Sequence, residues 1–260
     1  VYNAGAALFR SIGNSKISMN TSLIMNIINI CCNAVFIFCF HMGVAGVALA
    51  TLISRIISAI LIIALMFRTE SAIRINSSKD FFPCPSIIKK ILSIGLPSGL
   101  ENGMFQIGKL SVSSLVSTFG TASIAANSVA NSITTFANIP GNAIGMAMIT
   151  VIGQCIGAEK PDEAKYYGRK LLKIAYAGIL ATNIVMTLIA HPAVGLFHLS
   201  AEATATGISL LHYFSLVSVF IWPLSFTLPN ALRAAGDARY TMTVSIFSMW
   251  VFRDASSYFL

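Results

Sequence analysis

Long apolar runs separated by short polar breaks dominate the chain. The runs cover residues 17–40, about 44–67, 87–118, 121–157, 165–190 and 203–232, and a last one begins near Thr241. About 20 consecutive apolar residues cross a bilayer as an α-helix. The pattern therefore predicts an all-α membrane protein with about seven membrane helices in this chain, plus the end of another before Ile17.

Several of these predicted helices contain residues that favour a bend. The runs at 87–118 and 121–157 exceed the length needed to cross a bilayer, so these helices must tilt, kink or extend beyond it. Proline interrupts helical hydrogen bonding and is a common cause of kinks. We therefore expect bends near Pro97, near Pro140 with Gly141, and near Pro223.

Composition and charge support a membrane location. Only 10% of the residues are charged, where a soluble domain has roughly 25%. This excludes an ordinary soluble enzyme. The net charge of +8 would suit nucleic acid, but fourteen of the basic residues lie in or beside alternate loops of one side, and the loops near 41–43, 119–120 and 191–202 hold none. The positive-inside rule then places 69–86 and 158–164 in the cytoplasm and makes the lipid bilayer, not nucleic acid, the partner.

An internal repeat divides the chain into related parts. Residues 10–24, RSIGNSKISMNTSLI, resemble residues 233–247, RAAGDARYTMTVSIF, at a constant offset. Such parallel repeats are typical of transporters built from two homologous halves. We expect 1–68 to be the C-terminal part of a first six-helix lobe, 69–86 a cytoplasmic linker, and 87–260 a second lobe truncated in its fifth helix. On this interpretation the chain is a fragment, with about 136 residues missing before it and about 50 after it.

Several stretches together resemble the MATE family of multidrug and toxic compound extrusion transporters. They are FRSIGNSKISM, NICCN, GVAGVALATLISR, IGLPSGLENGMFQIGKL, FGTASIAANSVANSI, IPGNAIGMAM, GQCIGAEKPDEAKYY and NALRAAGDARYTM. The resemblance implies a two-lobed bundle of twelve helices, of which this chain runs from the end of helix 4 into helix 11. It implies a monomer of the inner membrane that exports amphipathic, mostly cationic compounds in exchange for Na⁺ or H⁺. The alternatives are a related lipid-linked oligosaccharide flippase and an inactive truncated remnant.

Glu101 is the leading candidate for cation coupling. Ionisable residues within membrane helices are costly and mark functional sites. A buried carboxylate can bind either a proton or a hard cation such as Na⁺. In the resemblance, Glu101 matches the helix-7 carboxylate proposed to bind Na⁺, but the second carboxylate expected in helix 10 is absent from 203–232. The coupling ion stays open, and Glu101 could instead be a structural partner of Lys109.

Polar side chains on the neighbouring helix are candidates to line a substrate cavity. Asn127, Asn131, Asn138 and Asn142 fall on one side of a continuous helix. A polar stripe cannot face lipid, so it must line a cavity or bond to another helix. Gln106 and Lys109 on the preceding helix are candidates for the same cavity.

The remaining candidates are less specific. Asp254 could neutralise Arg253 locally, and Arg55 could serve either helix packing or gating. An adaptable drug pocket could involve the residues Met104, Phe105, Met146, Phe220, Trp222 and Phe226, although membrane helices are rich in such residues anyway. The five cysteines have no metal-binding spacing, and we expect most of them to be buried and reduced. Neither HExxH nor GxSxG occurs, which disfavours an enzyme, and no cofactor is expected.

Overall fold

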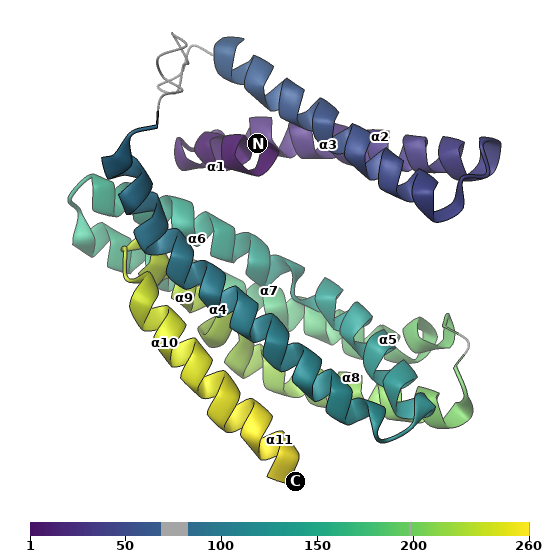
Figure 1. Ribbon diagram of the computed structural model, residues 1–260. Helices are drawn as coiled ribbons and strands as arrows, with labels where there is room; N and C mark the ends of the chain where they lie inside the picture. The colour runs from purple at the N-terminus through teal and green to yellow at the C-terminus, as the bar shows by residue number, and fades with distance from the viewer. Residues whose placement is uncertain (69–82, 198, 260) are drawn as a thin grey trace. The chain divides into compact units, whose positions relative to one another are not determined.

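The computed structural model describes residues 1–68, 83–197 and 199–259, and within these ranges every regular element is a helix (Figure 1). The chain forms two compact units, Val1–Cys84 and Pro85–Leu260. The predicted linker at 69–86 lies mostly outside the described residues. The assignment of the two units to the halves of a twelve-helix protein stays a prediction.

The described part of the N-terminal unit contains three α-helices. They are α1 (Tyr2–Ser11), α2 (Ser15–Ala34), which continues as the π-helix η1 (Val35–Cys39), and α3 (Gly43–Arg68). These bounds confirm the predicted apolar helices at 17–40 and 44–67. The buried residues of α3 recur every fourth position from Gly46 to Met66 and are mostly small. Small side chains let membrane helices approach closely.

Polar contacts add to this packing. The Asn29 amide on α2 donates hydrogen bonds to the hydroxyl groups of Ser54, at 3.3 Å, and Thr51, at 3.4 Å, on α3. Such bonds satisfy polar groups that lipid cannot solvate.

The C-terminal unit contains the remaining helices. They are α4 (Pro85–Ser117), α5 (Thr121–Ala137), α6 (Ile139–Gly157), α7 (Pro161–Gly195), α8 (Ala201–Trp222), the π-helix η3 (Pro223–Thr227), α9 (Leu228–Ala234), α10 (Ala238–Ser248), the π-helix η4 (Met249–Ala255) and α11 (Ser256–Phe259). α6 packs against α7, α8 against both α7 and α5, and α10 runs beside α4 (Figure 1).

The predicted bends have different outcomes. The expected single helix at 121–157 is broken at Asn138, two residues before Pro140, and α6 begins at Ile139. Pro140 lacks the amide hydrogen that would continue the helical ladder. Pro223 marks the change from α8 to the wider turns of η3, whereas α4 remains helical through Pro97.

The repeat found in the sequence is also a repeat of structure. After α1, Gly13 has φ of +82° and Asn14 has φ −90° and ψ 65°. After α9, Gly236 has φ of +95° and Asp237 has φ −93° and ψ 62°. In both turns the glycine amide donates to the carbonyl three residues back. The left-handed conformation favours glycine, which explains why this residue occurs in both copies.

The apolar surface of the helices fits a membrane. By length and composition, five helical segments among the described residues can cross a bilayer: Ser15–Cys39, Gly43–Arg68, Ile139–Gly157, Pro161–Gly195 and Ala201–Ala234. Large apolar side chains are exposed along them, for example Ile60, Leu188 and Leu216. The expectation of buried cysteines was wrong, because Cys31, Cys39 and Cys84 are exposed and Cys32 and Cys155 are half-buried; all five are free.

Candidate functional site

Glu101 lies on α4 and pairs with an arginine from the end of α9. Its Oε1 atom accepts a hydrogen bond from Nη2 of Arg233 at 2.7 Å. The alternative that Glu101 pairs with Lys109 was therefore wrong, because its partner is Arg233. Lys109 lies eight residues further along α4, where its side chain lines a pocket. The ion pair joins positions 132 residues apart and holds α4 to α9.

Only one of the two carboxylate oxygens of Glu101 has a hydrogen-bond partner among the described residues. Glu101 is 9% exposed, and its second oxygen, Oε2, is buried without a hydrogen-bond partner among the described residues. Arg233 uses its Nη1 atom to donate to Oδ1 of Asn230 at 2.9 Å. One carboxylate oxygen is thus held by the arginine, and the other has a lone pair available for a proton or a small cation.

Arg233 was classified from the sequence only as a basic loop residue. The structure places it in the last turn of α9, where it reaches back into the helix bundle. A signal was present, because Arg233 and Arg10 occupy equivalent positions in the repeat, each just before the glycine turn. In the first copy, however, Nη1 of Arg10 donates to the hydroxyl of Ser18, so the repeat alone does not identify a carboxylate partner.

A second carboxylate lies against the same side of α4. Glu101 and Gly108 are seven residues apart, which returns to nearly the same side of an α-helix. A Cβ atom added to Gly108 would come within 2.8 Å of Oδ2 of Asp254 on η4. Asp254 is 4% exposed, and neither of its carboxylate oxygens has a hydrogen-bond partner within the described part of the chain.

The expected local pairing of Asp254 with Arg253 was wrong. The guanidinium of Arg253 lies over the ring of Phe105 on α4, 5.5 Å from its centroid. Consecutive residues on η4 point in different directions, so Arg253 faces a pocket while Asp254 packs against Gly108. Although Arg253 and Asp254 are adjacent in the sequence, their charged groups do not pair.

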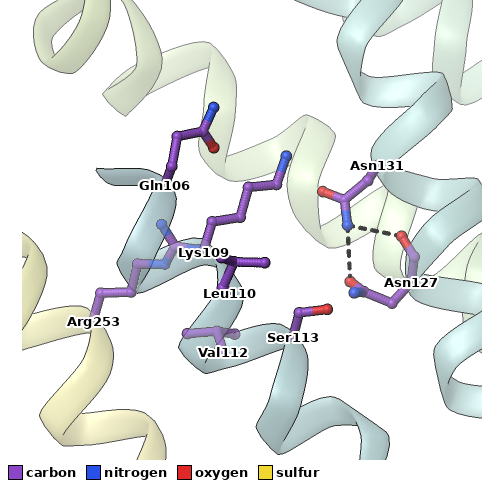
Figure 2. Close-up of a pocket in the computed structure, with 8 residues that line it drawn as sticks. All are labelled: Gln106, Lys109, Leu110, Val112, Ser113, Asn127, Asn131 and Arg253. Carbon is purple, nitrogen blue, oxygen red and sulfur yellow. Dashed lines mark hydrogen bonds between the residues drawn. The ribbon is translucent and has the colours of Figure 1, made fainter. Parts of the chain in front are cut away.

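A pocket of about 530 Å³ opens between α4, α5 and η4 (Figure 2). Its lining consists of Gln106, Lys109, Leu110, Val112, Ser113, Asn127, Asn131 and Arg253. In Figure 2, Lys109 extends from α4 toward the side formed by Asn127 and Asn131, and Arg253 enters from the opposite side. The pocket is thus lined by two cationic side chains, three side-chain amides and a small apolar wall.

The structure separates the four asparagines of the expected stripe. Asn127 and Asn131 line the pocket, and the Asn131 amide donates to Oδ1 of Asn127 at 3.2 Å and to its carbonyl at 2.9 Å. Asn138 lies at the helix break, with Oδ1 buried and without a partner in the described ranges, and Asn142 is exposed on α6. The single stripe is therefore divided at the helix break, and only its first two members line the pocket.

The other candidates fall into different places. Phe105 and Phe226 make an edge-to-face contact at 5.9 Å, and Phe226 stacks on Trp222 at 5.1 Å, so these three aromatic residues form one cluster. Met146 and Phe220 are exposed elsewhere. Arg55 is exposed on α3 in the N-terminal unit.

Comparison with known proteins identifies a family and relatives that match this chain. The family model MatE matches residues 97–259. The uncharacterized transporter YisQ of Bacillus subtilis is 30% identical over 94% of this chain and 54% of its own length. The probable multidrug resistance protein NorM of Mannheimia succiniciproducens is 27% identical over 96% of this chain and 55% of its own length. The chain thus spans about half the length of the curated relatives it matches.

Solved structures show the same helical arrangement. An outward-facing multidrug resistance transporter of the MOP superfamily superposes with a TM-score of 0.88 at 25% identity, covering 96% of this chain and 56% of that one. A MOP superfamily transporter from Pyrococcus furiosus, described as having a binding pocket of reverse polarity, gives a TM-score of 0.91 at 24% identity, covering 99% and 57%. The second likeness concerns the fold alone.

Proposed function

Because the chain belongs to the MATE family of integral membrane transporters, we propose that the full-length protein exports amphipathic small molecules across the inner membrane. Its relatives include probable multidrug resistance proteins, which supports efflux as the direction of transport. We further propose that an inward flow of Na⁺ or H⁺ drives this export and that the protein acts as a monomer.

The observation that carries the proposal is the environment of Glu101. A carboxylate buried in a membrane protein is expensive to maintain and is a functional-site candidate by default. Glu101 has one oxygen held by Arg233 and one buried oxygen without a partner. A cation that binds Oε2 reduces the negative charge available to Arg233 and weakens the contact between α4 and α9. Cation binding would thereby be linked to movement of these two helices, as alternating access requires.

The test uses reconstituted full-length protein in proteoliposomes with an imposed Na⁺ or pH gradient. The transported probes are three dansyl compounds of different charge: anionic dansylglycine, neutral dansylamide and cationic dansylcadaverine. We expect gradient-dependent movement of at least one of them. Glu101→Gln keeps the shape of the side chain but supplies no negative charge, and it should abolish the gradient dependence. Glu202→Gln, at an exposed position in the first turn of α8, is the matched control and should behave as wild type.

A second variant separates coupling from helix packing. If Glu101 only neutralises Arg233, the double variant Glu101→Gln/Arg233→Gln should recover gradient-driven transport, because no unpaired charge remains. If Glu101 binds the coupling ion, the double variant stays uncoupled at normal membrane abundance. Full recovery in the double variant, or wild-type coupling in Glu101→Gln, would exclude Glu101 from the coupling site.

A further inference from the structure

The pocket between α4, α5 and η4 is positively charged, whereas a carrier of cations is expected to have a negatively charged or neutral site. Two basic side chains line the pocket, Lys109 from α4 and Arg253 from η4, and no carboxylate is among the lining residues. A cationic ligand in this space would meet two like charges. A ligand with a negative group would meet two opposite charges, one from each of two helices.

Within the described ranges, neither Lys109 nor Arg253 forms an ion pair with an acid. The ion pairs of the described residues are Glu101 with Arg233 and two exposed pairs at the start of α7. The described contact of the Arg253 guanidinium is with the ring of Phe105, and cation–π contacts leave the in-plane hydrogen-bond donors of an arginine available. Both positive charges are therefore available to a ligand.

The two nearby carboxylates, Glu101 and Asp254, are not among the residues that line the pocket. Gln106, Lys109 and Ser113 follow the three- and four-residue spacing of one helix face. Glu101 and the Gly108 position that contacts Asp254 lie about 80° and 100° round the helix from Lys109. One helix thus presents a carboxylate to Arg233 on one side and an ammonium group to the pocket on another.

The remaining lining groups complete a site for an amphipathic anion. Gln106 and Asn127 carry amide groups that can donate hydrogen bonds to an anionic head group, whereas the Asn131 amide already donates to Asn127. Leu110 and Val112 form an apolar wall for a hydrocarbon or aromatic body. Phe105 restrains the guanidinium of Arg253, and a restrained arginine is suited to bidentate contact with a carboxylate. A cavity of about 530 Å³ is within the range of small-molecule sites.

We infer that this pocket binds amphipathic organic anions, with Lys109 and Arg253 contacting a carboxylate or chemically similar head group. The interpretation of this pocket as a substrate site rests on the proposed export function. It assigns a substrate class that differs from the mostly cationic compounds implied by the resemblance of the sequence. Glu101 retains its separate role on the other face of α4.

Equilibrium binding to the full-length protein in nanodiscs tests the inference directly. Dansylglycine and dansylcadaverine share one fluorophore and differ in the sign of their charge, so their fluorescence reports binding with matched apolar bodies. We expect dansylglycine to bind at least about tenfold more tightly, a difference that one charge-assisted contact supplies. Lys109→Gln and Arg253→Gln should each weaken dansylglycine by about tenfold and should not weaken dansylcadaverine.

Charge-conserving variants and a variant outside the pocket are controls that distinguish a lost contact from misfolding. Lys109→Arg and Arg253→Lys keep both positive charges and should retain the preference for the anion. Lys89→Gln removes a lysine from an exposed position near the start of α4, outside the pocket, and should leave both affinities unchanged. Equal binding of the two probes, preference for dansylcadaverine, or an anion preference unaffected by both Gln variants would overturn the inference.

The outcomes also distinguish this inference from the proposed function. Selective dansylglycine binding that depends on Lys109 and Arg253, without gradient-driven movement of any probe in proteoliposomes, would overturn coupled export and leave the anion site standing. Gradient-driven export of dansylcadaverine alone, without measurable dansylglycine binding, would overturn the anion site and leave coupled export standing.

Discussion

The pair between Glu101 and Arg233 shows how a single contact decides the cost of a charge in the helix bundle. The side chains of Arg233 and Glu101 are 24% and 11% exposed, so both are largely removed from solvent. Removing one partner of a buried pair leaves the other charge uncompensated, which costs more than losing the interaction itself. By contrast, Lys160 and Glu163 pair at 2.9 Å where both side chains are more than half exposed. There the hydrogen bond from Lys160 to Glu163 raises the pKa of the lysine, and water competes with the contact.

This contrast predicts different stability changes for the two pairs. Arg233→Gln should destabilise the protein by about 3–5 kcal/mol, because Glu101 is left as an unpaired buried charge. Adding Glu101→Gln should recover much of that loss. Thermal unfolding in detergent, followed as a double-mutant cycle, measures the coupling between the two positions.

The exposed pair provides the control for this cycle. Lys160→Gln and Glu163→Gln, singly or together, should leave the unfolding temperature unchanged within error, because exposed pairs contribute little. Additive effects of the Arg233 and Glu101 substitutions would contradict the structural pairing.

At the scale of elements, close approach of α6 to its neighbours depends on a missing side chain. A Cβ atom added to Gly141 would lie 2.1 Å from Cζ3 of Trp222 on α8 and 2.7 Å from Cδ1 of Ile179 on α7. The Thr227 hydroxyl on η3 also donates to the Gly141 carbonyl at 3.4 Å. Small residues allow such backbone approach in membrane helix packing.

Gly141→Ala should therefore destabilise the C-terminal unit by about 1–3 kcal/mol, the usual cost of overpacking. Trp222 must move, and its stacking on Phe226 must change with it. The measurement is the unfolding temperature in detergent together with the tryptophan emission in a Trp250→Phe background, in which Trp222 is the remaining tryptophan.

The same helix offers a matched control substitution. Gly153 lies on α6 with no atom within 4 Å of an added Cβ. Gly153→Ala should be neutral or slightly stabilising, because alanine has the higher helix propensity. Equal destabilisation by both substitutions would show that helix propensity or lipid contact, and not the approach to Trp222, sets the cost.

At the scale of the whole molecule, the distribution of charge predicts a direction across the membrane. The basic residues lie in and beside alternate loops, and such residues accumulate on the cytoplasmic side. α7 runs from Pro161, next to the turn at 158–160, to Gly195 and is long and apolar enough to cross a bilayer. The first end should face the cytoplasm and the second the exterior.

Labelling of single cysteines tests this orientation. In a variant in which the five natural cysteines are replaced by alanine, Leu196→Cys should react with a membrane-impermeant thiol reagent added to intact cells. Ala158→Cys should react only after the membrane is permeabilised. Both positions are exposed in the structure. Reaction of Ala158→Cys in intact cells, without reaction of Leu196→Cys, would reverse the proposed topology.

The sequence by itself determined the class of the protein, most of its helices and the position of its main break. Length and apolarity of a segment are local properties, and a bilayer selects helices on these properties alone. For this reason the runs at 17–40 and 44–67 correspond to α2 with η1 and to α3. Pro140 likewise predicted a bend that the structure shows at Asn138, and the repeated turn carries glycine in both copies because the left-handed backbone requires it.

Only the tertiary structure decided which charges meet. The partner of Glu101 is Arg233, 132 positions away, because the fold brings the end of α9 to α4, and no periodicity within α4 contains that information. Arg253 and Asp254 are adjacent in sequence yet point to a pocket and to Gly108, because η4 turns each side chain toward a different surface. The break at Asn138 likewise separated Asn138 and Asn142 from the pocket that Asn127 and Asn131 line. Side-chain direction depends on helix register and packing, and both are set by contacts between distant segments.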